Sequence, residues 1–239
     1  MSVFYRCEAE ALEAQSRATQ RTYTVGVDLG QTTDPTAIAV IEREVIPGVS
    51  LRHRRQTRDG SIAEAWGYDT AKDRTTFVLR HLERLALGTS YTAQVAYVHS
   101  LMGRPPLGTP DTALIIDQTG VGRAVFDMFN AAGMSPIGCT ITAGENETRC
   151  ADGWRVAKLQ LVSRLQAMLH SGQLEIAADL PDLAALKGEL QNFRVNFTAI
   201  GNMTFAARVG AHDDLVLAVA IALWYAEFRT RQGWTQADF

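Results

Sequence analysis

The sequence is poor in cysteine and has no apolar run long enough to cross a membrane. Its three cysteines, Cys7, Cys139 and Cys150, are odd in number and lack CxxC spacing. This argues against a disulfide framework or a zinc site and favours a reducing cytosol. The longest apolar run, over 215–226, is shorter than the roughly 20 residues that a membrane span needs, so we expect a core helix there. The N-terminus has no basic stretch followed by an apolar one, and no signal peptide is predicted.

An excess of positive charge is also missing, and so is one common type of ATP-binding loop. The formal net charge is -3, so no overall positive field attracts nucleic acid, and any such contact must come from local patches. The phosphate loop G-x-x-x-x-G-K-[ST] is absent, as is any Gly-Lys pair. We therefore expect no ATPase that uses this loop in the polypeptide.

The length bounds the number of domains. With 239 residues, 46% of them hydrophobic, the chain can form one well-buried domain but is short for two. We expect a single domain over 21–239, preceded by a tail or linker helix over 1–20.

The local patterns predict an α/β fold with a mixed sheet and helices on both faces. Apolar residues that alternate between turn-rich segments mark the strands, and apolar residues at helical spacing mark the helices. Strands 23–29, 36–43 and 49–57 are expected to form an antiparallel meander of three. The other expected elements are helices 70–86 and 91–101, strand 112–117, helix 121–132, strand 136–142, helices 154–171 and 182–191, a hairpin over 192–209 and helix 213–228.

Four aspartates stand where a folded chain could bring carboxylates together. Asp28 and Asp117 each end a strand-like segment, and Asp213 and Asp214 directly precede the apolar run 215–224. The first N–H groups and the dipole of a helix favour negative charge at such a position. If the two strands are adjacent and parallel, their ends meet at one edge of the sheet. Carboxylates are the ligands that hard divalent cations prefer, so the set predicts two-metal phosphodiester hydrolysis, with ions roughly 3.5–4 Å apart.

Each aspartate also has a simpler interpretation. Asp213 could act only as an N-cap, and Asp28 or Asp117 could be a turn-forming residue. The simpler interpretation is weaker for the whole set, because buried carboxylates at strand ends are costly without a partner.

Four motifs follow one another along the chain. They are Val-Gly-Val-Asp-Leu-Gly at 25–30, Ile-Ile-Asp-Gln-Thr-Gly-Val-Gly at 115–122, Asn-Phe-Arg at 192–194 and Gly-Ala-His-Asp-Asp-Leu-Val-Leu-Ala at 210–218. Together they resemble the nuclease domain of phage terminase large subunits, from about Tyr23 to the end of the last helix. The last motif is the most specific of them.

The resemblance implies a ribonuclease H-like fold and an endonuclease that cuts concatemeric viral DNA during genome packaging. It also implies two metal ions, Mg²⁺ or Mn²⁺. Asp28 and Asp117 match the first two metal-binding acids of that family, and Asp213 with Asp214 matches the terminal acidic pair. Which member of the pair binds metal directly stays open.

The missing ATPase motif is a departure from a full terminase large subunit. We therefore expect either an excised C-terminal domain or a separately encoded nuclease subunit. The resemblance implies double-stranded DNA as substrate and an ATPase motor, a small terminase subunit and a portal as partners. It also implies a phage or prophage protein in the host bacterial cytoplasm, with no membrane association.

Three other interpretations start from the same residues. The segment Gly-Val-Asp-Leu-Gly-Gln-Thr-Thr at 26–33 resembles the first phosphate loop of the actin, Hsp70 and sugar-kinase superfamily. A second glycine-rich phosphate loop is missing, however, and the chain is short for two such domains. A Holliday-junction resolvase would share the fold and the acids, but the length and the hairpin before the last helix favour the terminase. A catalytically silent binding module is less compatible with four retained aspartates.

Basic residues supply further candidates. The dense basic run over 52–58, with Arg52, Arg54 and Arg55, could contact phosphates or could protect a strand edge. Arg194 and Arg208 lie on the expected hairpin, which could guide a DNA strand or form a plain sheet edge.

Two single residues complete the set of candidates. Lys158 has a place in the family-like pattern and could contact the scissile phosphate, or it could be an ordinary surface lysine. His212 adjoins the acidic pair and could bind metal, orient water or cap the helix.

Overall fold

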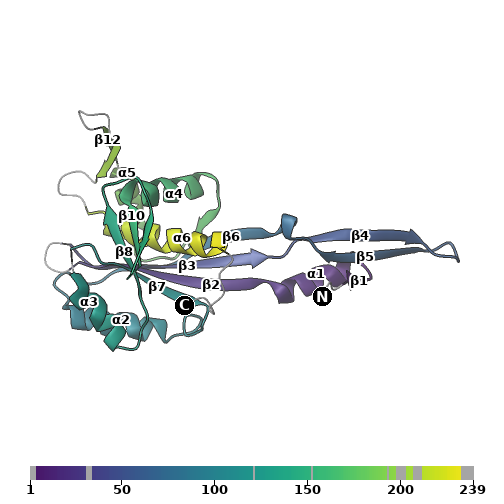
Figure 1. Cartoon of the computed structure of the whole chain (residues 1–239), viewed down its shortest axis with the longest axis horizontal. Coiled ribbons are helices and arrows are strands. Elements are labelled where there is room, and N and C mark those ends of the chain that lie inside the picture. The colour runs from purple at the N-terminus through teal and green to yellow at the C-terminus, as the bar shows by residue number, and fades with distance from the viewer. Residues whose placement is uncertain are drawn as a thin grey trace. The chain divides into compact units, whose positions relative to one another are not determined.

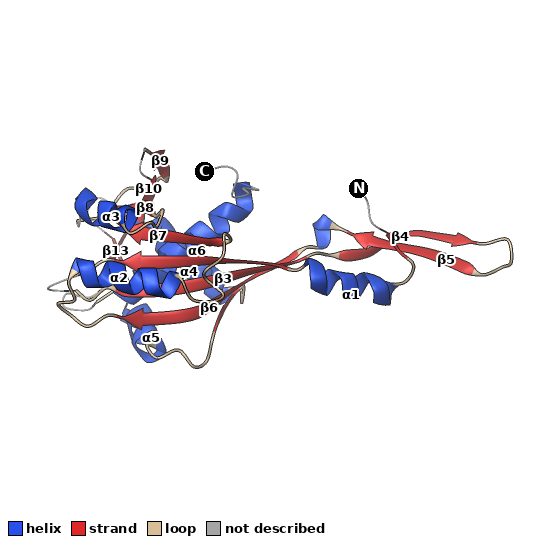
Figure 2. Cartoon of the chain, turned by 90° about the horizontal axis from the view of Figure 1, so that it is seen from below, coloured by secondary structure: helices blue, strands red, loops and turns tan. Residues whose placement is uncertain are grey.

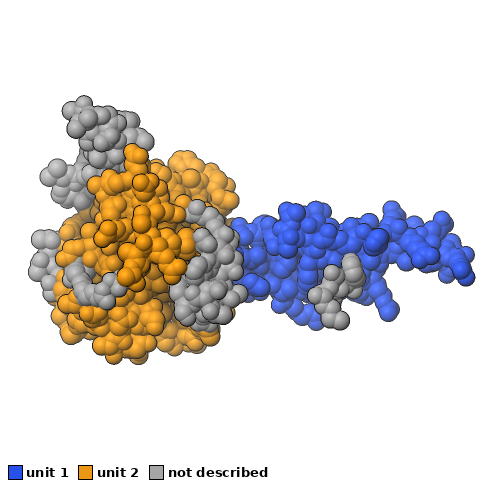
Figure 3. Space-filling model, in the orientation of Figure 1, with its two compact units in different colours: residues 1–21, 43–76 blue, residues 22–42, 77–239 orange. Residues whose placement is uncertain are grey.

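The structure is a computed structural model that describes residues 4–30, 34–120, 122–151, 153–192, 194–197, 203–206 and 212–232. The chain divides into two compact units, coloured separately in Figure 3. Unit 1 comprises 1–21 and 43–76, and unit 2 comprises 22–42 and 77–239. No helix in the part of the chain described here is both long and apolar enough to span a bilayer.

The main sheet has eight strands in the order β11-β6-β3-β2-β7-β8-β10-β9. The pairs β2–β7, β7–β8, β8–β10 and β6–β11 are parallel and β9–β10 is antiparallel, so the sheet is mixed, as predicted. The strands are β2 (Gln20–Asp28), β3 (Ala37–Ile46), β6 (Arg74–Arg84), β7 (Thr112–Asp117), β8 (Ile137–Thr142), β9 (Thr148–Cys150), β10 (Gly153–Ala157) and β11 (Leu174–Ile176).

Helices cover both faces of this sheet, as the sequence predicts (Figures 1 and 2). Along β3, Ile38 and Val40 pack into one hydrophobic core, and Ala37, Ala39 and Ile41 pack into the other. This alternation follows from the two-residue period of a strand. The first core includes α2 (Tyr91–Met102) and α3 (Gly122–Ala131), and the second includes α4 (Lys158–His170), α5 (Leu183–Asn192) and α6 (Asp214–Gln232).

Gly26 sets the approach of α6 to the sheet. A Cβ atom at Gly26 would lie 2.5 Å from the carbonyl oxygen of Ala218 and 2.7 Å from the Cβ atom of Ala222. A glycine in the middle of β2 therefore lets the backbone of α6 lie directly against the strand, which a larger residue would prevent. The first turn of α6 is buried, and so is the helix as far as Ala226.

Unit 1 contains a small antiparallel sheet in the order β1-β5-β4. Helix α1 buries Ala11 and Ala14, and the Nε2 atom of Gln15 donates a hydrogen bond of 2.6 Å to the carbonyl oxygen of Pro47. The elements are β1 (Phe4–Tyr5), α1 (Glu8–Ala18), β4 (Val49–Gln56), β5 (Ile62–Tyr68) and a short 3-10 helix over Thr70–Lys72.

One predicted element and one predicted strand pairing are wrong. The expected helix 70–86 is the 3-10 turn followed by strand β6, because 74–84 is rich in β-branched and aromatic residues and buries Phe77 and Leu79 two positions apart. The expected third strand, 49–57, pairs with β5 instead of the main sheet, which takes β6.

Elsewhere the predicted elements agree with the structure to within a few residues, apart from the start of helix 154–171. Its first residues form β10, so the helix begins at Lys158. The hairpin before the last helix is confirmed by the antiparallel pair β12 (Arg194–Phe197) and β13 (Met203–Ala206).

Candidate active site

Asp28 and Asp117 lie side by side at one edge of the main sheet. Strands β2 and β7 are parallel neighbours. Asp28, the last residue of β2, is paired in the register with Asp117, the last residue of β7. Asp117 is 7% exposed, and its Oδ1 atom accepts a hydrogen bond of 2.8 Å from the backbone N–H of Thr119. Two buried parallel strands therefore present two carboxylates at the same edge.

Helix α6 brings Asp213 and Asp214 to this edge. The pKa of Asp28 is raised well above its usual value, first by burial and then by the negative charges of Asp117, Asp214 and Asp213. Burial also raises the pKa of Asp117, although the hydrogen bonds from Thr119 oppose the shift. Asp28 is thus close enough to be repelled by each of the other three carboxylates, and the structure brings the four aspartates of the sequence hypothesis to one edge.

The two adjacent aspartates at the start of α6, Asp213 just before the helix and Asp214 as its first residue, have different partners. Asp213 accepts a hydrogen bond of 2.6 Å from Nζ of Lys158, and its side chain is 23% exposed. Asp214 is 4% exposed and receives two bonds from Arg84, from Nε to Oδ2 at 2.6 Å and from Nη2 to Oδ1 at 2.9 Å. Asp213 therefore lies nearer to solvent, while both oxygens of Asp214 are held by a guanidinium.

Glu189 completes the buried ion network around Arg84. Its Oε1 atom accepts from Nη2 of Arg84, and its Oε2 atom accepts at 2.9 Å from the backbone N–H of Val216, one of the unpaired donors in the first turn of α6. The backbone N–H of Arg84 donates to Oδ2 of Asp182 at 2.9 Å. Burial raises the pKa of Glu189 to about 7, with the negative charge of Asp214 adding to the shift and the Val216 N–H opposing it. Arg84 thus joins β6, the start of α5 and the first turn of α6.

Sequence reasoning missed Arg84, Glu189 and Asp182. Arg84 lay in a segment expected to be helical, and Glu189 on a helix with no sign that its carboxylate would be buried. A strand pattern over 74–84 would have placed Arg84 at a strand end, beside the ends of the other strands. No local pattern identifies the partners of Glu189.

Lys158 and His212 both lie near the acids but have different surroundings. Burial raises the pKa of both Asp28 and Asp117, and the positive charge of Lys158 opposes this rise, so the lysine is part of the acidic edge. His212 is half-exposed, and its Nδ1 atom lies 3.0 Å from Oδ1 of Asp34, in the segment between β2 and β3.

Where the structure describes them, the basic candidates belong to other elements than the four aspartates. Arg52, Arg54 and Arg55 lie on β4 in unit 1, whereas the acids lie in unit 2. Arg194 is on β12, but its side chain lies outside the described part of the structure. Arg208 lies wholly outside the described residues.

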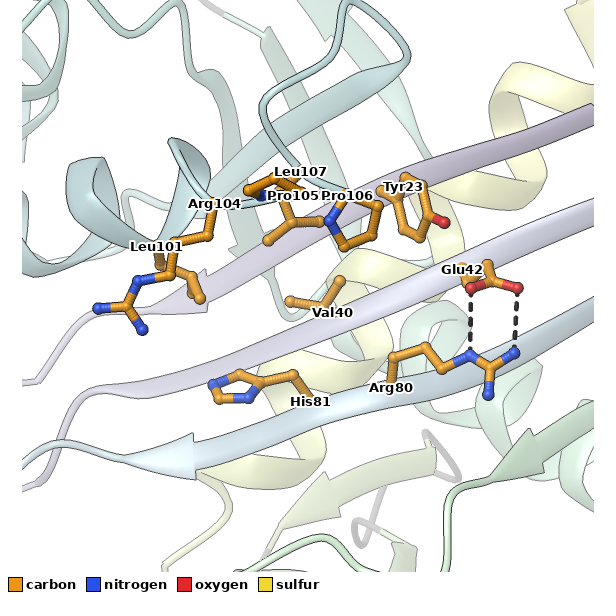
Figure 4. A pocket seen from close by; sticks show the side chains of 10 residues that line it. All are labelled: Tyr23, Val40, Glu42, Arg80, His81, Leu101, Arg104, Pro105, Pro106 and Leu107. Carbon is orange, nitrogen blue, oxygen red and sulfur yellow. Dashed lines mark hydrogen bonds and ion pairs between the residues drawn. The ribbon is translucent and has the colours of Figure 1, made fainter.

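A pocket of about 290 Å³ lies elsewhere in unit 2 (Figure 4). Tyr23, which lines it, precedes Asp28 by five residues on β2, or roughly 17 Å along the strand. Arg80 on its wall is paired with Glu42 through two hydrogen bonds of 3.1 Å. The pocket is therefore separate from the acidic edge.

The carboxylate oxygens at the acidic edge are of the kind that binds a divalent cation, although they are not arranged as a coordination site. Among the described residues, no three His, Cys, Asp or Glu side chains form a group that could hold a metal ion as they stand. Asp213 and Asp214 instead have Lys158 and Arg84 as counter-ions. Carboxylate oxygens are nevertheless the ligands that a hard cation takes, and burial together with mutual repulsion raises the pKa of Asp28 among them.

Sequence comparison finds relatives among large terminase subunits. No protein-family model matches the chain. The large terminase subunit of Thermus phage G20c is 26% identical over 162 residues, which is 68% of this chain and 29% of that protein. The large terminase subunit of Thermus virus P23-45 is 27% identical over 121 residues, or 51% of this chain and 21% of that protein. The matched part is thus less than a third of either relative's length.

Solved structures show the same similarity in the fold. The crystal structure of the large terminase nuclease from thermophilic phage G20c has a TM-score of 0.51 and 22% identity, covering 86% of this chain and 82% of that one. The structure of the same nuclease with bound magnesium has a TM-score of 0.52 and 24% identity, covering 85% and 80%. The predicted ribonuclease H-like α/β fold is therefore confirmed.

Proposed function

We propose that this chain, a relative of large terminase nuclease domains in sequence and in fold, is a metal-dependent endonuclease that hydrolyses DNA phosphodiesters. The observation that supports this most directly is the parallel register that sets Asp28 beside Asp117, with the start of α6 at the same edge. Buried carboxylates that repel one another are destabilising, and their concentration at one edge calls for a cationic partner.

Asp28, Asp117 and Asp213 are the residues that would hold the cations. Divalent ions bound there would neutralise charge on the phosphate and stabilise the attacking and leaving oxygens. The solved G20c nuclease has been determined with magnesium and with cobalt, and we infer the same class of cofactor, Mg²⁺ or Mn²⁺, for this chain. Asp213 is preferred over Asp214 because Asp214 is already engaged through both of its oxygens.

The remaining residues position these acids. Arg84 and Glu189 hold the first turn of α6, so that Asp213 stays at the edge. The backbone N–H of Thr119 orients the carboxylate of Asp117. Lys158 pairs with Asp213 when no cation is present, and its ammonium group would be available for a phosphate oxygen once a cation takes its place.

The biological setting follows from the relatives and is part of the proposal. We infer that the substrate is concatemeric viral DNA, cut during genome packaging in the cytoplasm of an infected host. The grip on DNA would come mainly from an ATPase motor, together with a small terminase subunit and a portal. Little sequence preference is expected, because the acids act on the phosphate backbone, which carries no base information.

Cleavage of supercoiled plasmid tests the proposal. We expect nicking and linearisation with Mn²⁺, none with EDTA, and none by Asp28→Asn or Asp117→Asn. Asp127→Asn, an exposed aspartate on α3, is the matched control and should cut normally. Cutting that persists in both of the first two variants would place the active site elsewhere.

The choice between the two acids of α6 is tested in the same assay. Asp213→Asn should raise the Mn²⁺ concentration needed for half-maximal cutting more than Asp214→Asn does. The reverse order would assign metal binding to Asp214. Preference for a four-way junction over linear duplex would instead favour a resolvase.

A further inference from the structure

The β4–β5 hairpin of unit 1 separates its charges by face. Residues along a strand point alternately to the two faces of a sheet, and partners in the register share a face. Arg54 is opposite Glu64, so that face carries a cation beside an acid. Next in the register, Arg55 is opposite Ala63 and His53 is opposite Ala65, so the other face carries cations beside alanines.

The arginines of the hairpin differ in whether they have a carboxylate partner. Nε of Arg54 lies 3.5 Å from Oε1 of Glu64, and Nη2 of Arg52 lies 3.7 Å from Oδ1 of Asp69. Within the described residues, Arg55 and His53 have no such carboxylate partner, and both side chains are exposed. The face defined by His53, Arg55, Ala63 and Ala65, which we call the alanine face, therefore carries positive charge that the protein does not neutralise.

The turn of the hairpin adds another exposed arginine. Thr57 and Ser61 close the turn through a backbone hydrogen bond of 2.8 Å, and Gly60 takes a positive φ of 85° within it. The acid of the turn, Asp59, accepts hydrogen bonds from the backbone N–H of Ser61 at 3.1 Å and from its hydroxyl at 2.8 Å. Arg58 is thus presented on an ordered turn whose carboxylate is engaged internally.

The hairpin is also sterically available within its own unit. All residues from Leu51 to Gln56 are exposed, and Figures 1 and 2 both show the far end of β4 and β5 extending beyond α1. Residues 49–68 contain four arginines against two acids, although the whole chain has a net charge of -3. The small alanine side chains leave room for a broad polyanion to approach the strands closely.

We propose that the alanine face and Arg58 bind the phosphate backbone of duplex DNA, as a contact separate from the acidic edge. This inference rests on the proposed function, since it takes duplex DNA as the substrate. A phosphate backbone fits because exposed guanidinium groups on an extended strand can each pair with a phosphate without reading a base. The contact would add to the grip on DNA without taking part in the chemistry.

Binding of a fluorescent 30-base-pair duplex, measured by anisotropy in EDTA so that no cutting occurs, tests the proposal. Arg55→Gln/Arg58→Gln is the test variant, and Arg52→Gln/Arg54→Gln is its control with the same loss of charge. We expect the test variant to bind roughly tenfold or more weakly near 0.1 M salt, and the slope of log Kd against log salt to fall by about two. The control should lose much less affinity.

Adding one lysine to either face of the hairpin tests whether the face, and not the added charge, determines the affinity for DNA. Ala63→Lys adds a cation opposite Arg55, whereas Ile62→Lys adds the same charge to the next residue on the opposite face; both positions are exposed. Only Ala63→Lys should tighten binding and steepen the salt dependence. Equal effects of the two lysines, or of the two double variants, would show that overall charge and not this face governs binding, and would overturn the proposal.

The outcomes are independent of those for the nuclease. If plasmid is cut normally while the Arg55/Arg58 variant binds duplex like the wild type, the hairpin contact is refuted and the proposed function stands. If the duplex is bound through the alanine face but no plasmid is cut with Mn²⁺, the proposed function fails and the hairpin contact stands.

Discussion

Replacing Arg84 with methionine should destabilise unit 2 through the acids it leaves behind. Methionine keeps much of the aliphatic stem but removes the guanidinium that contacts Asp214 and Glu189. These acids are 4% and 8% exposed, so neither can be fully hydrated without local rearrangement. The variant therefore tests whether a buried ion network holds the first turn of α6 in place.

The size of the effect follows from burial. Removing one partner of a buried ion pair costs about 3–5 kcal/mol, because the other charge stays buried without compensation. The side chain of Arg84 is 24% exposed, so water screens the network in part and the lower end, about 3 kcal/mol, is expected. For a domain of this size, 1 kcal/mol shifts Tm by about 2–4 °C, which gives a decrease of roughly 6–12 °C.

Arg80→Met is the matched control on the same strand. Arg80 makes two hydrogen bonds to Glu42, which is itself buried, so its loss also leaves a buried acid behind. Only one acid is left in this case, however, and the side chain of Arg80 is 51% exposed, so water screens the pair more and Tm should fall less than in Arg84→Met. Thermal unfolding of both variants in EDTA, followed by circular dichroism, gives the comparison.

A triple variant separates buried charge from lost packing. Arg84→Met/Glu189→Gln/Asp214→Asn removes the charge of both buried acids together with that of the arginine, and it should regain most of the lost Tm because neutral side chains need no counter-ion. The reasoning is refuted if Arg84→Met melts no lower than Arg80→Met. Failure of the triple variant to recover would attribute the loss to packing alone.

Two further predictions concern stability. The pKa of Glu189 is raised to about 7 in the folded chain, so between the unfolded value near 4.5 and about pH 7 the folded state binds the extra proton, and stability should fall as pH rises. Glu189→Gln should remove this contribution, at most roughly 3 kcal/mol between pH 5 and pH 7.5; identical slopes of urea-unfolding free energy against pH in variant and wild type would contradict it. Gly26→Ala should destabilise unit 2 by about 1–3 kcal/mol, because its Cβ would meet the backbone of α6. Gly188→Ala on α5, where no atom lies within 4 Å of the new Cβ, should instead stabilise by about 0.5–1 kcal/mol, and equal unfolding midpoints for the two variants would rule out the close approach.

The predicted elements were reliable where burial follows one clear period. The segments ending at Asp28 and Asp117 are continuous apolar strands, and the run after Asp214 is apolar throughout, so their type and ends could be predicted locally. Over 74–84, leucines spaced three apart near its end imitate a helix, while Thr75, Thr76 and Val78 favour a strand. The sheet decided between these tendencies, because the backbone of β6 pairs with β11.

The amino-acid sequence alone determined which carboxylates lie at the ends of strands and helices, because secondary-structure propensity and hydrophobic periodicity depend on residues close together in the chain. Only the tertiary structure decided that β2 and β7 pair in the register that sets Asp28 beside Asp117. It alone distinguished Asp214 from Asp213, because the partners of Arg84 lie 130 and 105 positions away along the chain. Contacts at such separations depend on how buried surfaces and charges fit together in three dimensions, and no local pattern records that fit.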